Sequence, residues 1–437
     1  MSASTATVTP LARLAAALPG LPGGPAWAAW RAAALERLLT HGLPTPRDDA
    51  WKYTSLRLLE RRALEPAPSR PLATSALDEL PAIAGARLVF VDGRFHAALS
   101  APRLPDGCAF TPFAQRFAAA APAALGAGLA GDAARIDERV RTLNACLAAD
   151  GPSLVVAPGS RPAAPVVIVH VATGGGAYPR TRVELGAGAA LELLEVHLSA
   201  ADAEAAVVAA GDFVLAAGAE LTHSSLQVTG RRTILLDDAA VVVAAGARYR
   251  HRLVGLGGQL TRLDLRVALD GPGASAELAG VFFPDGTREQ HLRTLVEHRT
   301  PGTTSDQLYR GVAAGRGRGS YDGKVVVHAG AAKTESRQSS RNLLIGREAA
   351  IESRPQLEIN ADDVKCSHGA TTGTLDENML FYLLARGLDR DTARALLTYA
   401  FVGDVLRRLR PEGLRRAAER HVLGRLPAAE LLREFVA

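Results

Sequence analysis

Cysteine and long apolar runs are both scarce in this chain of 437 residues, and each shortage excludes a class of protein. The three cysteines, Cys108, Cys146 and Cys366, are widely spaced and odd in number, which does not fit a disulfide framework. No uninterrupted apolar run approaches the ~20 residues that span a bilayer. The N-terminus lacks a basic segment followed by an apolar core and a cleavage site. We therefore expect a cytoplasmic protein without membrane association.

The motifs of nucleotide binding and of common hydrolases are missing as well. Residues 317–324 resemble a phosphate loop, but the first glycine is one position early and Val325 stands where a Mg²⁺-binding hydroxyl belongs. Neither a Gly-x-Ser-x-Gly elbow nor a His-Glu-x-x-His pair occurs. Asp362 and Asp363 are adjacent, so on a strand their carboxylates face opposite sides. These absences favour a protein that is not an enzyme.

One dense basic stretch stands out against a net charge of only +5. It runs from Arg407 to Arg420 and carries six arginines, with no aromatic residue between them. Basic runs of this kind are usually the solvated face of a helix, and base stacking needs aromatic side chains. A nucleic-acid partner is therefore not expected.

A repeat occupies the middle of the chain, from residue 153 to about residue 373. Its unit is an alternating strand, a Gly-Ala corner and another strand, as in VELGAGAALEL and FVLAAGAELTH. A fixed period of 27 to 30 residues is typical of a solenoid, and short strands without crossover helices favour a parallel β-helix. The alternative is a β-sandwich, whose turns recur every 8–12 residues. The corner glycines are Gly188, Gly218, Gly246, Gly273, Gly302 and Gly330.

Segments with helical periodicity flank this repeat on both sides, and this change of pattern predicts three domains. Residues 1–150 form a mainly helical N-terminal domain with a short β-hairpin at residues 88–95, around an Asp-Gly turn. Residues 151–373 form the parallel β-helix core, and residues 374–437 form a C-terminal helical domain. The predicted fold is therefore mainly β, with helices at both ends.

Individual helices can be placed from apolar spacing and capping residues. Residues 27–39 have helical periodicity and are stopped by a glycine and a proline, and the Ala-rich segment 113–150 is also expected to be helical. Asp376 and Asp389 are N-cap residues of two helices in the last domain. Residues 412–437 supply one or two more.

The strongest sign of chemistry lies in residues 321–373, where Cys366 stands two residues before His368. Thiolate and imidazole are soft ligands for iron and zinc, and a Cys-x-His pair on a strand puts both side chains on one face. Two ligands are too few for a closed metal site, so the pair is either half of a shared site or part of the core. His291 and His298 are expected to be packing residues.

Several motifs resemble the SufB/SufD family of iron–sulfur cluster assembly scaffolds, and most of all its SufD members. The match is dense from about residue 281 to residue 406 and reappears in residues 51–54 (WKYT). It is carried by SDQLYRG at Ser305–Gly311, DGK at Asp322–Lys324, NLLIG at Asn342–Gly346, PQLEI at Pro355–Ile359, DDVKCSHGAT at Asp362–Thr371, and FYL at Phe381–Leu383 with Arg386 and Gly387.

The resemblance implies a right-handed parallel β-helix that serves as a scaffold and performs no catalysis. It implies a heterodimer with a SufB-like paralogue, together with a SufC-like ABC ATPase that docks on the C-terminal helices. The residues implied in this docking are Phe381, Tyr382, Arg386, Gly387 and Phe401.

The resemblance also implies an assembly site between the two paralogues. His368 is implied to face a SufB cysteine, where this chain has Ser340 at the matching position. Cys366 is the weaker candidate ligand, and Arg310 keeps the charge of a lysine found in many relatives. The implied cofactor is a transient iron–sulfur cluster shared with the partner. None is expected on the isolated chain, because four ligands are needed and only Cys366 lies in this stretch.

Two other functions suit the same fold. A β-helix carbohydrate lyase or hydrolase needs acidic or Ca²⁺-binding clusters along a groove, which the sequence does not display. In a purely structural homodimer, Cys366 and His368 are only packed. The sequence leaves open whether the isolated chain is a monomer or a homodimer, and whether a flavin binds the complex.

Overall fold

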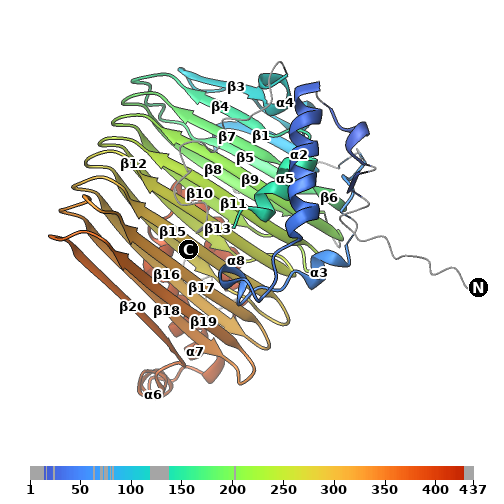
Figure 1. Ribbon diagram of the computed structural model, residues 1–437. Helices are drawn as coiled ribbons and strands as arrows, with labels where there is room; N and C mark the ends of the chain where they lie inside the picture. Colours follow the sequence, from blue (N-terminus) through green and yellow to red (C-terminus); the bar gives the residue numbers. More distant parts are fainter. Residues whose placement is uncertain are drawn as a thin grey trace, which may run out of the picture.

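The computed structural model describes residues 14–118, 137–200 and 203–427, except positions 16, 23–24, 63, 69–71, 73–76, 79 and 81–82. Its centre is a long stack of strands that form two sheets facing each other (Figure 1). From β7 to β20, successive strands alternate between the two sheets, so each pair of strands makes one coil. The predicted solenoid is therefore confirmed.

Each sheet contains ten strands. The first sheet consists of β1 (Ala86–Val91), β2 (Arg94–Phe95), β5 (Val166–Ala172), β8 (Ala190–Ser199), β10 (Glu220–Gln227), β12 (Arg248–Gly255), β14 (Ser275–Phe282), β16 (Thr304–Ala314), β18 (Glu335–Ile345) and β20 (Lys365–Gly373). The second sheet consists of β3 (Cys108–Pro112), β4 (Pro152–Val156), β6 (Gly175–Ala177), β7 (Arg180–Leu185), β9 (Ala205–Leu215), β11 (Ile234–Val243), β13 (Leu260–Leu269), β15 (Glu289–His298), β17 (Arg318–Val327) and β19 (Ala350–Ile359).

Strands of successive coils pair in parallel and in register. Residues one coil apart are paired: Ser340 of β18 lies beside Tyr309 of β16 and Ala370 of β20. Antiparallel pairing occurs at the N-terminal end, between β1 and β2 and between β3 and β4. The β1–β2 pair is the predicted hairpin, with Asp92 and Gly93 at positive φ in the turn.

The corners of the coils explain the Gly-Ala repeat. All six predicted corner glycines have φ between +65° and +83°, which costs glycine little because it has no Cβ. The residue after each glycine is fully buried between neighbouring coils: Ala189, Ala219, Ala247, Ala274, Thr303 and Ala331. A β-sandwich is excluded because the strands are parallel and one coil apart.

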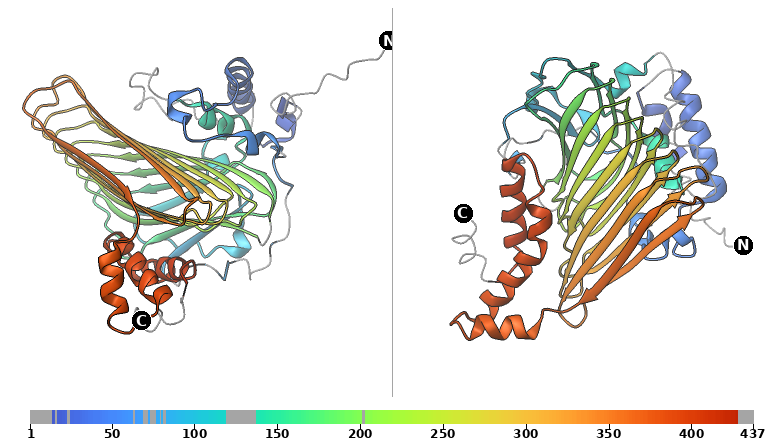
Figure 2. Two further views of the ribbon diagram at one scale, coloured as in Figure 1. Left: turned by 90° about the horizontal axis from the view of Figure 1, so that it is seen from below. Right: turned by 90° about the vertical axis from the view of Figure 1, so that its left-hand side faces the viewer.

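The N-terminal segment covers the outer face of the second sheet (Figures 1 and 2). Helix α2 (Pro25–His41) packs on α5 (Arg139–Leu147), and α5 packs on β9 and β11. The expected helix 113–150 is confirmed only at α4 (Phe113–Arg116) and α5, because the described residues 117–118, 137–138 and 148–150 are not helical. Residues 119–136 lie outside the described part. Short elements complete this cover: η1 (Leu18–Gly20), η2 (Asp49–Trp51), α3 (Arg57–Glu60) and η4 (Ala97–Leu99).

Two strands of this N-terminal segment extend the solenoid. β1 pairs in parallel with β5, and β3 pairs with β4. Their apolar residues, such as Phe90, belong to the same core cluster as the coils. The sequence period does not include these strands, because they precede the first Gly-Ala corner.

Within the described residues three helices follow β20, and the last two cover the outer face of the first sheet, on the opposite side of the solenoid (Figure 2). The three helices are α6 (Glu377–Leu384), α7 (Arg390–Leu406) and α8 (Glu412–Leu423), and α7 packs on β14 and β16. Asp376 and Asp389 accept hydrogen bonds from backbone N–H groups of the first turns, as predicted for N-caps. Among the described residues, no helix is long and apolar enough to cross a membrane.

Candidate functional site

His368 and Cys366 lie on β20, the strand that closes the series of coils. β20 pairs with β18 on one side, and within the described residues no strand pairs with its other side. Cys366 is half-buried and packs against the solenoid core, whereas His368 is exposed. Because residues two apart on a strand share a face, both side chains project from the inward face at the open end.

Burial makes the Cys366 thiol a poor ligand at neutral pH. Desolvation raises the pKa of Cys366, and a hydrogen bond with the Ser336 backbone offsets only part of this effect. Metal ligation requires the thiolate, so a rise in pKa weakens binding. The His368 side chain, in contrast, is exposed at the open end of the solenoid.

The turn before β20 corrects one assumption of the sequence analysis. Asp362 and Asp363 are exposed and lie in this turn, not on a strand. Asp363 has a φ of +53°, and its carbonyl accepts a hydrogen bond from the Lys333 backbone at 2.7 Å. The backbone of Asp363 therefore shapes the corner, because Asp tolerates the left-handed region better than most residues.

A polar ladder runs through the interior just beneath the last coil. The inward positions of β18 are Ser336, Gln338, Ser340 and Asn342, all of them buried. Gln338 donates to the Tyr321 hydroxyl at 2.9 Å, and that hydroxyl donates to Gln307 at 3.1 Å. The sequence analysis missed this ladder. Its signal is the alternation of polar residues along a strand whose inward face is normally apolar.

Ser340 stands inside this ladder, one coil below Ala370. Its side chain is fully buried, and its hydroxyl has no hydrogen-bond partner among the described residues. A hydroxyl has no thiolate to offer, so this position does not supply a soft ligand. The structure therefore brings His368 and Cys366 together on β20 and places Ser340 on the next strand inward.

Helix α6 carries an exposed apolar surface, formed by Met379, Phe381 and Tyr382, which are 57%, 71% and 55% exposed. Arg386 stacks on the Tyr382 ring at 4.2 Å, and Gly387 ends the segment with a φ of +89°. A groove of about 450 Å³ lies between this surface and Leu397 of α7. Large apolar side chains gathered in this way commonly mark an interaction surface.

Phe401 differs from the other predicted docking residues in its surroundings. It is half-buried on α7 and packs against the apolar layer between the helices and the first sheet. The Arg310 guanidinium lies 5.7 Å from its ring and forms an ion pair with Asp404 at 2.6 Å. Arg310 therefore joins β16 to α7, and its positive charge is needed to pair with Asp404.

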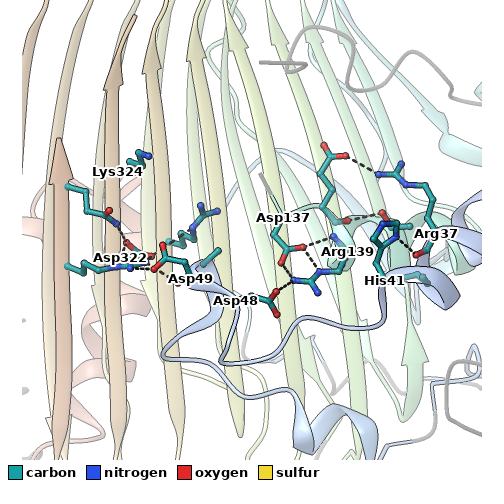
Figure 3. A pocket seen from close by; sticks show the side chains of 15 residues that line it. Arg37, His41, Asp48, Asp49, Asp137, Arg139, Asp322 and Lys324 are labelled. Atoms are coloured by element: carbon teal, nitrogen blue, oxygen red, sulfur yellow. Dashed lines mark hydrogen bonds and ion pairs between the residues drawn. The ribbon is translucent and has the colours of Figure 1, made fainter. Parts of the chain in front are cut away.

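A charged cavity of about 650 Å³ lies between the N-terminal cover and the second sheet (Figure 3). Arg139 pairs with Asp137 at 2.5 Å and with Asp48 at 2.8 Å. Arg354 pairs with both Asp322 and Asp49 at 2.6 Å. The pair of Arg354 with Asp49 joins the second sheet to the cover, whereas the pairs of Arg139 lie within the cover itself.

The WKYT motif has a structural reason in the same cover. Arg262 of β13 stacks on the ring of Trp51 at 3.8 Å and donates to the Thr54 hydroxyl at 2.8 Å. Trp51 is buried, so the motif fixes the N-terminal segment on the solenoid.

Buried histidines fall into two groups. His291 bonds to the Ser320 hydroxyl at 2.8 Å, and His298 bonds to the hydroxyls of Thr303 and Ser305 at 2.8 and 2.9 Å, as expected for packing residues. A second group, His170, His197, His223 and His251, surrounds Glu195 in the interior near the N-terminal end. Sequence reasoning missed this second group.

Charges within this second group are strongly shifted. Burial is the main cause that lowers the pKa of His197 to about 3, so its imidazole is neutral. Burial opposes ionisation of Glu195, but hydrogen bonds from His170 and His223 outweigh it and hold its pKa well below the usual range. Burial and the charge of Glu195 raise the pKa of Asp237 well above its usual range.

Comparison with known proteins places the chain in a family. A family model described as "SUF system FeS cluster assembly, SufBD core domain" matches residues 168–401, more than half of the chain. The iron–sulfur cluster assembly protein SufD of Escherichia coli (strain K12) is 31% identical over 405 residues, which cover 90% of this chain and 92% of that protein.

Two further relatives extend this result. Protein ABCI7, chloroplastic, of Arabidopsis thaliana is 27% identical over 421 residues, covering 91% of this chain and 85% of that protein. An iron–sulfur cluster assembly SufBD family protein of Mycobacterium leprae is 32% identical over 206 residues, covering 45% of this chain and 53% of that protein. With its solenoid and its matching core, this chain belongs to the SufB/SufD family and is similar to SufD.

Proposed function

We propose that this chain is a non-catalytic scaffold subunit that assembles iron–sulfur clusters together with a partner chain. The observation that carries the proposal is the position of His368, exposed on the inward face of the terminal strand β20. Cys366 shares that face and is half-buried. Two donors cannot hold a cluster, which normally needs four protein ligands. A second chain must therefore complete the site.

The open end of the solenoid supports pairing with a SufB-like paralogue. Strands β19 and β20 each have a neighbouring strand on one side, and the described residues place no strand on the other. An exposed strand edge is a template for pairing with another chain. A paralogue with the same coil spacing matches that edge, and its cysteine would approach His368.

Helix α6 supports docking of a SufC-like ATPase. Phe381 and Tyr382 face outward beside an apolar groove, and Asp376 fixes the start of the helix. α7 connects this surface to the first sheet through Arg310 and Asp404. Movement of the docked ATPase is thereby passed through α7 to the strands of the assembly site.

The assembly role of His368 is tested in a complex co-expressed with the SufB-like and SufC-like partners. We expect His368→Ala to lower iron and acid-labile sulfide per complex by roughly 10-fold, the scale of effects near metal sites. Ser367→Ala, on the opposite face of β20, is the matched control and should keep its cluster. Unchanged iron and sulfide in an intact His368→Ala complex would remove this role.

The docking role of α6 is tested by recovery of the ATPase in a pull-down. Loss of a large aromatic anchor costs about 2 kcal/mol or more of binding energy, so Phe381→Ala should weaken recovery by roughly 30-fold in affinity. Leu39→Ala is the control, because Leu39 is also exposed but lies on α2. Equal recovery with both variants would contradict docking at α6.

A further inference from the structure

A compact group of metal-ligand side chains lies inside the solenoid, far along the chain from β20. His170 is on β5, and Glu195 and His197 are on β8. Each offers one ligand atom, and these three atoms lie within 4.8 Å of one another. All three side chains are buried, with exposed fractions of 5%, 8% and 2%. Imidazole and carboxylate in a ratio of two to one are a common donor set for zinc and iron(II).

The solenoid itself creates this arrangement. His170 and His197 are 27 residues apart, which is one coil, and their backbones are paired in register. Their rings stack with centroids 4.9 Å apart and an angle of 22° between the ring planes. Glu195 is two residues before His197, so its carboxylate projects to the same inward face. The His170 Nε2 to Glu195 Oε1 distance is 3.0 Å.

Unsatisfied polar atoms and a small void adjoin the two histidines. Among the described residues, the Nδ1 atoms of His170 and His197 and the hydroxyl of Thr229 have no hydrogen-bond partner. All three residues line a void of about 10 Å³. Buried polar atoms in proteins are normally paired, so three such atoms around one void need an occupant. The void has room for about one water-sized sphere.

The donor set favours a cation over a water molecule. The carboxyl of Asp237 lies 4.0 Å from His197 Nε2, so a second carboxyl group stands beside the three proposed ligands. Imidazole and carboxylate are common ligands of divalent transition metals. A water molecule would satisfy the hydrogen bonds, but a divalent ion would also engage the Glu195 carboxylate, whose ligand atom lies within 4.8 Å of those of both histidines. We propose that His170, Glu195 and His197 form a structural site for a divalent transition-metal ion, independent of the cluster-assembly role of β20.

Binding requires a small contraction of the site. Tetrahedral zinc with bonds of about 2.0–2.1 Å puts its ligand atoms roughly 3.4 Å apart. The side chains therefore move inward by about 1 Å from the present limit of 4.8 Å. Because the site is closed, the ion enters during folding, and its binding free energy adds to the stability of the fold.

Zinc content after refolding tests the site. The full-length chain, carrying a tag without histidine, is unfolded in guanidinium with chelator and refolded with Zn²⁺, and free metal is removed. We expect about one zinc ion per wild-type chain, and at least about fivefold less in His197→Gln and Glu195→Gln. The melting temperature should rise with Zn²⁺ for the wild type only.

Two controls separate this site from others. His298→Gln removes an equally buried histidine outside the cluster and should keep the zinc. The double variant Cys366→Ser/His368→Ala removes the proposed assembly ligands and should keep it too, so failure of one proposal does not imply failure of the other. Equal zinc in the wild type and in folded His197→Gln would overturn the proposal.

A spectroscopic measurement covers the case in which the variants do not fold. Wild-type protein refolded with Co²⁺ should develop the strong visible absorption of a tetrahedral site, and one equivalent of Zn²⁺ should abolish it. Absence of this absorption, together with an unchanged melting temperature in Zn²⁺, would show that the void holds water and would overturn the proposal.

Discussion

The two covers of the solenoid are attached by different forces. The N-terminal cover is held on the second sheet by buried ion pairs: Arg141 of α5 contacts Asp212 at 2.6 Å and Asp238 at 2.8 Å. The C-terminal cover is held on the first sheet mainly by apolar contacts from α7 and α8, such as Leu406 and Leu414.

Neither cover relies on one force alone: Leu143 of α5 also packs in an apolar cluster with Val208, and Arg310 of β16 pairs with Asp404 of α7. The more deeply buried ion pairs are those of Arg141, in the N-terminal cover. The cover proposed to carry ATPase-driven movement is the one that depends more on apolar contact.

Breaking the ion pairs should produce the largest effect. Arg141→Ala leaves Asp212 and Asp238 buried with less positive charge, and the loss of one partner from such a group costs about 3–5 kcal/mol of unfolding free energy. Chemical denaturation measures this loss. Arg161→Ala is the control, because its pair with Glu220 is exposed and should cost at most about 1 kcal/mol. Similar losses in both variants would contradict the comparison.

Removing apolar contact from the other cover should cost somewhat less. Leu406 is fully buried beneath α7, and Leu406→Ala should lower the unfolding free energy by about 2–4 kcal/mol. Hydrogen exchange should show faster opening of α7 and α8 while α5 stays protected. Leu39→Ala, at an exposed position of α2, should change stability by less than about 0.5 kcal/mol. Faster exchange of α5 in Leu406→Ala would argue against independent attachment.

Acid should loosen the N-terminal cover first. Burial raises the pKa of Asp238, but Arg266 and Arg141 outweigh it, so the net shift is downward. Hydrogen bonds from the Thr45 backbone and from Arg354 lower the pKa values of Asp48 and Asp49. A lowered folded pKa means that the stabilisation is present above the unfolded value near 3.8 and is lost as the pH falls through the folded value.

Hydrogen exchange at two pH values measures this effect. Protection factors of α2 and α5, corrected for intrinsic rates, should fall by more than those of α7 and α8 as the pH drops from about 4 to about 2, below the unfolded value near 3.8. An equal fall in both covers would indicate that the difference in their attachment does not govern their stability.

The smallest effect on stability is expected on α6. Phe381 is 71% exposed, so Phe381→Ala should change the unfolding free energy by less than about 0.5 kcal/mol. Thermal denaturation of the isolated chain checks this. A clear loss of stability would mean that Phe381 packs within the chain in solution and is not available to a partner.

Much of the fold could be predicted because the solenoid repeats in sequence. Gly218 and Gly246 predict corners because glycine readily adopts the positive φ that a corner needs. Asp376 and Asp389 predict helix starts because Asp is a common N-cap residue. The β1–β2 hairpin could be predicted from its Asp-Gly turn, but the pairing of β1 with β5 could not, since β1 enters the sheet before the repeat begins. Contacts between distant segments, such as Arg262 on Trp51, have no local signal at all.

The candidate sites also differ in whether their residues are neighbours in the sequence or are brought together only by the fold. His368 and Cys366 could be found because they are neighbours in sequence. His170 and His197 are joined only through the coil period, and the repeat of 27 to 30 residues could have paired them had it been applied to histidines. Glu195 and Asp237 face each other from different sheets, which no spacing along the chain reveals.

Among the described residues, no strand or helix covers the outer edge of the last coil, and α7 and α8 lie along the side of the stack (Figure 2). The outer edge of β20 therefore presents unpaired backbone N–H and C=O groups, which can form hydrogen bonds with another extended chain. If a paralogue covers this edge, as proposed, a cell that makes this protein in excess over that paralogue should accumulate end-to-end dimers or aggregates. On that proposal the two chains must be made in matched amounts, because the edge of β20 stays unpaired without the partner.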